Sequence, residues 1–376
     1  MSPVARSDAL AQRSLAVLLE GQSRSGAFIA SPSFPVYHYA WLRDGAFCAH
    51  ALDLVGEPSA ARAFHAWVAE TLLAHRSLIE EALARVEGGE RRDWKGAATP
   101  SAAPEHMPPA RYTLRGTLED AGGQAGAAEP WPNFQLDGYG MWLWALAEHL
   151  RSDPPQGDVR AAAALTARYL AAAWNLPCFD CWEEWGGGEH ASTLGAVVAG
   201  LEAAARILAE PVWGETAQRV RAVLRSRFSD GRRLRRGAQD DRVDGSLLWL
   251  GVPFGVLEPG DALLRATVDA IREDLAGPGG GLYRYRGDTY FGGGQWLLLT
   301  SSLAWHDAVA GEHALAAAEQ AWVRAQATDE LELPEQVTDH ALSPAMVQPW
   351  RQRWGPVATP LLWSHAMYLI AEAAVG

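Results

Sequence analysis

The chain has 376 residues, of which 48% are hydrophobic and 20% are charged, so it can bury a sizeable core and is neither disordered throughout nor a single coiled coil. Asp and Glu (45) outnumber Lys and Arg (32), and the net charge of -13 disfavours nucleic acid and anionic membranes as partners. The first thirty residues contain polar positions throughout, and no run of eighteen apolar residues occurs. We therefore expect no signal peptide, no membrane span and a cytoplasmic location.

Apolar residues recur at helical spacing along most of the chain, beginning behind a cap at Ser7 and Asp8. Gly and Pro separate these segments, as at Gly56 and Pro58, and strand patterns are short and few. The pattern predicts about twelve helices, the first after Asp8 and the others near residues 43–55, 57–85, 135–151, 158–174, 191–209, 213–228, 243–257, 260–275, 294–310, 311–327 and 359–375.

Helices in close succession, rich in Ala and without a composition break that resembles a linker, predict one all-α domain over residues 1–376. Its expected form is an (α/α)6 barrel, a double ring of six helix pairs. An α-solenoid is the alternative, but solenoids have a fixed repeat period, and here the connections vary from about two to about forty residues. A closed toroid fits this variation better.

Long connections alternate with short turns. They cover residues 21–42, 91–133, 176–190, 277–294 and 327–359. Connections this long inside a compact domain are usually functional. We expect one end of the barrel to carry the site.

Tryptophan is unusually frequent, with 17 Trp against 9 Phe and 9 Tyr. An indole suits either a core or the apolar face of a sugar ring. Four lie inside helical patterns and are predicted core residues: Trp67, Trp142, Trp144 and Trp249. Six lie at or beside segment ends and are candidates for a site: Trp41, Trp131, Trp182, Trp185, Trp354 and Trp363.

Three cysteines, Cys48, Cys178 and Cys181, are too few for a disulfide framework in a chain of this length, which fits a reducing compartment. Cys178 and Cys181 have C-x-x-C spacing, but no second pair or His doublet accompanies them. We interpret them as small residues in a packed loop and predict no metal site.

The segment LPCFDCWEEWGGGEH (176–190) places Glu183 and Glu184 between Trp182 and Trp185. Packing against indole desolvates a carboxyl group and raises its pKa, which would keep a glutamic acid protonated for general-acid catalysis. An exposed Glu pair before a glycine turn explains the pattern as well.

A second carboxyl group comes from LELPEQVTDH, where Glu335 follows Pro334 in a segment with little helical pattern. Glycoside hydrolysis needs two carboxyl groups on opposite sides of the scissile bond, and they can come from distant segments. Glu335 is the natural second member, although an ordinary loop glutamate is the simpler interpretation.

The segment YHYAWLRD (37–44) joins Arg43 and Asp44 to aromatic residues just before a helix. Sugar hydroxyls, which both donate and accept, are suitable partners for an inward-facing Arg and Asp. The alternative has Asp44 as a helix cap and Arg43 exposed.

Taken together, these segments resemble family 15 of the glycoside hydrolases, the glucoamylase family. YHYAWLRD, FDCWEEW and ELPEQV resemble three of its elements, and RYRGDTYFGGGQWLLLT and TPLLWSHAMYL resemble two more. The five occur in the family's order and span residues 37–369.

The resemblance implies that Glu183 is the general acid and that Glu335 is the base that activates water. It places Arg43, Asp44 and Arg284 around the hydroxyls of the terminal glucose. The residues that it implies for lining the sugar sites are Tyr37, Trp41, Trp182, Glu184 and Trp363. It further implies the double-ring fold, release of glucose from nonreducing ends with inversion, and no cofactor.

Two departures from the family pattern bear on the substrate. Many bacterial members carry a β-sandwich domain before the barrel and some fungal members a starch-binding module after it, and 376 residues leave room for neither. Trp185 stands where the family often has Arg or a small aliphatic residue, which would alter the wall beside the second sugar. We expect a monomer that acts on small oligosaccharides, above all isomaltose.

Other functions are open at this point. A trehalase or a maltose-type glucoamylase of the same family would share the glucose-holding residues. A helical toroid that only binds carbohydrate is the non-enzymatic alternative, which the presence of both Glu183 and Glu335 disfavours. A toroidal lyase for uronate polymers would need a basic cleft, which the net charge of -13 disfavours.

Overall fold

The computed structural model describes residues 8–87, 107–119, 131, 133–151 and 153–376. Its α-helices are α1 (Ala9–Glu20), α2 (Leu42–Val55), α3 (Pro58–Ala74), α4 (Arg76–Glu87), α6 (Asp137–Leu150), α7 (Gly157–Ala173), α8 (Ala191–Leu208), α9 (Pro211–Arg227), α10 (Ala262–Leu275), α11 (Leu297–Ala310), α12 (His313–Ala325), α13 (Val347–Trp354) and α14 (Leu362–Val375). The 3-10 helices are η1 (Pro35–Tyr37), η3 (Gly245–Leu250), η4 (Pro278–Gly280), η5 (Tyr290–Gly292) and η6 (Pro344–Met346).

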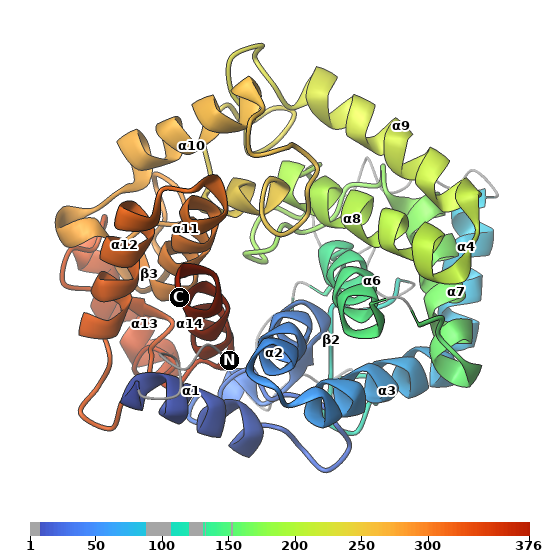
Figure 1. Ribbon diagram of the computed structural model, residues 1–376, viewed down its shortest axis with the longest axis horizontal. Helices are drawn as coiled ribbons and strands as arrows, with labels where there is room; N and C mark the ends of the chain where they lie inside the picture. Colours follow the sequence, from blue (N-terminus) through green and yellow to red (C-terminus); the bar gives the residue numbers. More distant parts are fainter. Residues whose placement is uncertain (1–7, 88–106, 120–130, 132, 152) are drawn as a thin grey trace.

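The helices form two concentric rings (Figure 1). In the inner ring α2 packs on α6, α6 on α8, α8 on η3, η3 on α11, α11 on α14, and α14 back on α2. Helices α1, α3, α7, α9, α10 and α12 lie outside them (Figure 1). Because the inner ring closes on itself, the predicted all-α double ring is confirmed and the solenoid is excluded.

The burial pattern of each helix explains its ring. Helices α6, α8, α11 and α14 are buried on nearly every face, as expected of elements covered on both sides. Helix α10 instead buries a stripe at three- and four-residue spacing, from Leu264 through Thr267, Val268 and Ile271 to Leu275. Inner and outer helices therefore differ in the width of their apolar face.

Two glycines set the close approach of α6 and α8. A Cβ atom on Gly200 would lie 2.6 Å from the Cα atom of Gly140, and a Cβ atom on Gly140 would lie 2.2 Å from the carbonyl oxygen of Ala196. Neither position accepts a side chain unless the backbones move apart.

Three helix predictions need correction. The segment 57–85 is two helices, because His75 leaves helical geometry. No Gly or Pro marks this break in the sequence. The segment 243–257 forms only the short η3, because Gly251, Pro253 and Gly255 interrupt it. Helix α13 lies in the predicted loop 327–359 and was missed because it has only eight residues and none of them is fully buried.

Several predicted core residues behave as expected. Trp67, Trp142, Trp144 and Trp249 are buried. The cysteines are free and buried, in agreement with packing positions.

One described helix, α8, is long and apolar enough to cross a membrane by those two measures, but 83% of its apolar stretch is buried inside the protein, as in a core helix.

Two short antiparallel pairs fix the segments that lead into inner helices. Strand β1 (Ala40–Trp41), just before α2, pairs with β2 (Arg111–Tyr112). Strand β3 (Gln295–Trp296), just before α11, pairs with β4 (Gln336–Val337). The second pair holds the segment that carries Glu335 beside the start of α11.

Candidate active site

Arg43 and Asp44 lie in the first turn of α2, and both are buried. Arg43 donates from Nη1 to Oε1 of Gln135 (2.7 Å) and Oδ2 of Asp137 (3.0 Å), and its Nη2 lies 3.7 Å from Oε1 of Glu183. The N-cap of α2 is Trp41 rather than Asp44. The structure therefore supports the inward-facing Arg and Asp and excludes the alternative of a capping Asp44 with an exposed Arg43.

Glu183 occupies the loop between α7 and α8 in left-handed backbone geometry, with φ of 67°. This conformation is uncommon for a residue other than glycine and persists where the surroundings enforce it. Its Oε1 accepts from the indole N–H of Trp41 (2.6 Å) and from Nε2 of Gln135 (2.9 Å). The side chain is 14% exposed, so this carboxyl group is oriented by its donors and still reaches solvent.

Asp180 enforces that loop geometry. Its Oδ1 accepts from the backbone N–H groups of Trp182 (3.2 Å) and Glu184 (2.9 Å), and its carbonyl oxygen accepts from the N–H of Glu183 (3.0 Å). Three successive residues thus depend on one aspartate. Burial acts to raise the pKa of Asp180, but His190 and Arg236 lower it below its ordinary value.

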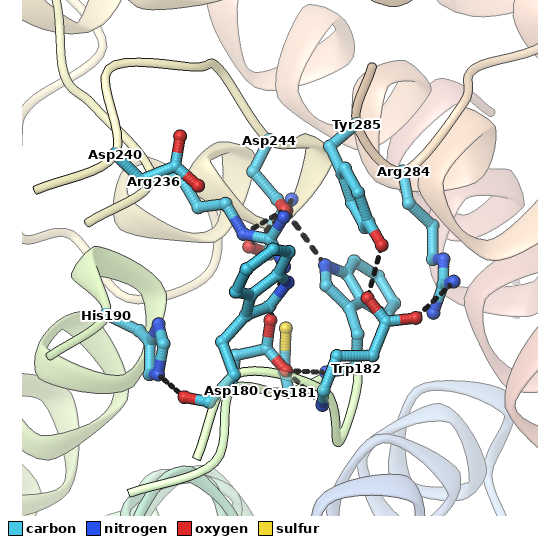
Figure 2. A network of polar contacts seen from close by, with 12 residues as sticks. Asp180, Cys181, Trp182, His190, Arg236, Asp240, Asp244, Arg284 and Tyr285 are labelled. Atoms are coloured by element: carbon cyan, nitrogen blue, oxygen red, sulfur yellow. Dashed lines mark hydrogen bonds and ion pairs between the residues drawn. The ribbon is translucent and has the colours of Figure 1, made fainter. Parts of the chain in front are cut away.

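A buried network continues from Asp180 to the neighbouring segments (Figure 2). Arg236 forms ion pairs with Asp180 and, at 3.4 Å, with Asp244. Both carboxylate oxygens of Asp244 lie 3.0 Å from Nε1 of Trp182, which donates to them. The indole of Trp182 is therefore fixed by a residue 62 positions away.

Glu184 points toward the loop that precedes α11. Its Oε1 accepts from Nη2 of Arg284 (2.9 Å), and its Oε2 accepts from the hydroxyl of Tyr285. Arg284 is also held by Asp288, through Nε to Oδ2 (2.7 Å) and Nη2 to Oδ1 (2.6 Å). Burial raises the pKa of Glu184, although Arg284 opposes the shift.

Glu335 is only 2% exposed. Its Oε1 accepts from the hydroxyl of Tyr37 (2.9 Å), which lies 2.9 Å from the hydroxyl of Tyr290. Its Oε2 is buried and has no hydrogen-bond partner in the structure. Burial raises the pKa of Glu335 to about 7, although hydrogen bonds from the tyrosines and the charge of Arg284 oppose the shift.

Tyr37 and Trp41 join the two candidate catalytic carboxyl groups. Tyr37 donates to Glu335, Trp41 donates to Glu183, and the two rings pack edge to face with centroids 5.6 Å apart. Glu183 and Glu335, which are 152 positions apart in the sequence, thus belong to one site.

Several polar atoms around these carboxyl groups are buried without a hydrogen-bond partner in the structure. They are Nε of Arg43, Oδ2 of Asp44, Nε1 of Trp296, Nε1 of Trp363 and Oε2 of Glu335. A buried polar group without a partner costs about 1–3 kcal/mol. Together they offer donors and acceptors to a ligand that both donates and accepts, which describes a sugar better than a metal ion or an apolar molecule.

Every predicted site residue lies in this region, but not all face the same way. Trp363 is buried beneath Arg43, whose guanidinium carbon lies 5.5 Å from the ring centroid, and Trp182 is buried against Trp249 and Trp296. Of the tryptophans predicted from segment ends, Trp185 is the exposed one, at 46%. Its ring lies over the guanidinium groups of Arg236 and Arg242, at 5.1 and 5.3 Å.

Sequence reasoning missed the residues that orient the predicted ones. They are Gln135, Asp137, Asp180, Arg236, Asp244, Tyr285, Asp288 and Tyr290. Tyr285, Asp288 and Tyr290 lie inside the quoted segment RYRGDTYFGGGQWLLLT, so that motif already contained the signal for them. The others contact the site across the fold and carry no local pattern.

The sequence profile of the glycosyl hydrolases family 15 matches residues 5–93 and 114–343. The chain is 40% identical to the isomaltose glucohydrolase of Kribbella flavida, in an alignment of 382 positions that covers 99% of this chain and 94% of the relative.

Solved structures give the same picture. A wild-type glycosidase superposes with a TM-score of 0.89 at 38% identity, covering 99% of this chain and 98% of the other. A bacterial glucoamylase complexed with acarbose superposes with a TM-score of 0.73 at 20% identity, covering 98% of this chain and 56% of the other. At that identity the second likeness supports the fold alone.

Proposed function

The chain belongs to family 15 of the glycosyl hydrolases and is a glycoside hydrolase, and on this premise we propose that it releases glucose from the nonreducing end of small α-glucosides, preferably isomaltose, with inversion at the anomeric carbon. The name of the Kribbella flavida relative supports isomaltose as the substrate. The likeness to that relative covers nearly the whole length of both chains.

Glu335 is the proposed base. An inverting glycosidase needs a carboxylate that takes a proton from water on the face opposite the leaving group. Oε1 of Glu335 is held by Tyr37, while Oε2 is buried and unpartnered, so Oε2 is the atom available to that water. This unpartnered oxygen beside an oriented one is the single observation that carries the proposal.

Glu183 is the proposed acid. Its Oε1 is occupied by the donors of Trp41 and Gln135, which leaves Oε2 to carry the proton to the departing oxygen. The two oxygens of each carboxyl group therefore have separate tasks, one for orientation and one for proton transfer.

The terminal glucose is proposed to lie among Arg43, Asp44 and Arg284. Nε of Arg43 and Oδ2 of Asp44 lie 3.6 Å apart as an ion pair and have no hydrogen-bond partner, so they supply one donor and one acceptor to its hydroxyls. Arg284 is fixed by Asp288 and Glu184, so it presents its charge at a defined position. Tyr37, Trp41, Trp182 and Trp363 shape the surrounding walls.

The exposed indole of Trp185 supports a short substrate. It follows Glu184 in the sequence, on the side of the site where we expect the second sugar, the leaving group, to lie. Its ring packs against two guanidinium groups. A flat wall there would pack against one sugar ring. Cytoplasmic location, a monomeric state, a single domain and independence of cofactors remain predictions from the sequence.

The substrate proposal is tested with purified enzyme on isomaltose, maltose, trehalose, panose and soluble starch, with released glucose as the readout. We expect the highest kcat/KM on isomaltose. A higher kcat/KM on trehalose would identify a trehalase, and a higher kcat/KM on maltose or starch would identify a maltose-type glucoamylase that prefers α-1,4 linkages.

A further inference from the structure

A second cluster of ionisable side chains lies away from the active site. Asp53 near the end of α2, His65 in α3 and His149 near the end of α6 each place one ligand-type atom within 4.8 Å of the others. Nδ1 of His149 lies 2.9 and 3.0 Å from the two carboxylate oxygens of Asp53. The rings of His65 and His149 are 5.0 Å apart.

His65 is the unusual member of this cluster. It is 2% exposed, and neither of its ring nitrogens has a hydrogen-bond partner in the structure. A neutral imidazole normally satisfies one donor and one acceptor, and an unpaired buried polar group costs about 1–3 kcal/mol.

We infer that Asp53, His65 and His149 form a binding site for a divalent transition-metal ion, Zn²⁺ in particular. Two imidazole nitrogens and one carboxylate oxygen are a ligand set that zinc accepts, with a fourth position for water. The side chains of His149 and Asp53 are 8% and 16% exposed, so a water molecule can reach the ion.

Binding requires a small rearrangement. An ionised Asp53 only accepts, so the hydrogen between it and His149 belongs to Nδ1. Coordination through Nδ1 moves that hydrogen to Nε2, which leaves the ring neutral. The ion replaces the hydrogen bond as the link between Asp53 and His149, and a ring nitrogen of His65 gains the partner that it lacks.

The cluster is remote from the catalytic groups. Asp53 and Asp44 are nine residues apart in α2, which is about 13 Å along the axis at about 1.5 Å per residue. An ion there would tie α2, α3 and α6 together, and α2 and α6 are neighbours in the inner ring (Figure 1). We therefore expect the ion to stabilise the fold without entering the reaction.

The test uses the full chain, stripped with a chelator and dialysed. Titration calorimetry with Zn²⁺ should give one tight site per chain, and Co²⁺ should give the visible absorption of a four-coordinate ion. At roughly a hundredfold excess over the Kd, Zn²⁺ should raise the Tm by at least about 2 °C, with kcat on isomaltose unchanged.

His65→Gln should abolish the tight site and the Tm shift. The matched control is His306→Gln, because His306 is also buried with an unpartnered Nδ1 but lies in α11, outside the cluster. If His65→Gln does not fold, Asp53→Asn and the Co²⁺ spectrum of the wild-type chain take its place. The inference is overturned if wild type binds no Zn²⁺ or Co²⁺, or if His65→Gln or Asp53→Asn binds as wild type does.

Discussion

The two proposed catalytic carboxyl groups are set in different surroundings. Glu183 lies in a strained loop that is tied down by a buried polar network, and one of its oxygens has two donors. Glu335 follows Pro334 and precedes a two-residue strand, is almost fully buried, and has one oxygen without a partner.

For Glu183 the surroundings mainly fix the position of the carboxyl group, and for Glu335 they mainly change its pKa. The position of Glu183 depends on Asp180 and Arg236. In contrast, burial raises the pKa of Glu335 to about 7, and the hydrogen bond from Tyr37 opposes this shift. The sequence suggested a raised pKa for a carboxyl group of the Glu183–Glu184 pair, and burial raises the pKa of Glu184 as well as that of Glu335. Variants of the two regions should therefore fail in different ways.

The largest expected effect follows from removing the carboxyl group of Glu335. Without a proton acceptor for water, Glu335→Ala should lower kcat on isomaltose by roughly 10² to 10⁴ while glucose binding, measured by calorimetry, remains. Glu332→Ala is the matched control, because Glu332 pairs with Arg13 outside the site. More than about a tenth of wild-type kcat in Glu335→Ala would remove it as the base.

Glu183→Gln should lose activity according to the leaving group. We expect a loss of roughly 10² to 10⁴ on isomaltose and a much smaller loss on a glucosyl fluoride of the accepted configuration, since fluoride departs without protonation. Glu189→Gln, in the same loop and paired with Arg227, should change neither rate. Equal losses on both substrates would assign Glu183 to binding.

Asp180→Ala should displace Glu183 without altering Glu335. Loss of the two side-chain contacts from Oδ1 to the N–H groups of Trp182 and Glu184 should lower kcat on isomaltose by roughly 10- to 100-fold, with a smaller loss on the fluoride. The Tm should also fall, since Arg236 loses a buried partner. Asp241→Ala, which removes an exposed partner of Arg235, is the control. Equal losses on isomaltose and fluoride would contradict a positioning role.

Tyr37→Phe should move the pH profile. The Tyr37 hydroxyl stabilises the ionised form of Glu335, so its removal should raise the pKa of Glu335 above its present value of about 7. Because the base acts when ionised, activity is lost below its pKa, and the acid limb of kcat/KM should shift to higher pH with a loss at the optimum of less than about tenfold. An unmoved acid limb, or one shifted to lower pH, would show that Glu335 does not set it.

The sequence predicted the rings better than the loops. The spacing of apolar residues located the long helices, because inner helices bury nearly every face and outer helices bury a stripe at helical spacing. It failed in three places: His75 breaks a helix without Gly or Pro, Gly251 and Pro253 reduce an inner helix to η3, and α13 has only eight residues and buries none of them fully.

The predicted site residues came from short motifs, and the structure brings them into one region. The supporting residues could not be predicted in the same way. Asp180 meets Arg236 across 56 positions, and Trp182 meets Asp244 across 62. No local pattern joins such pairs, because folding alone makes them neighbours.

Glu183 and Glu335 are proposed to act as acid and base on opposite faces of the glycosidic bond. Inverting glycosidases hold these groups roughly 6.5 to 9.5 Å apart so that a water molecule fits between the base and the anomeric carbon. Proton NMR of the anomeric signals in the first minutes of isomaltose hydrolysis, before mutarotation equilibrates them, tests this directly. Attack by water on the face opposite the leaving group gives β-glucose as the first product, and α-glucose as the first product would rule out these roles.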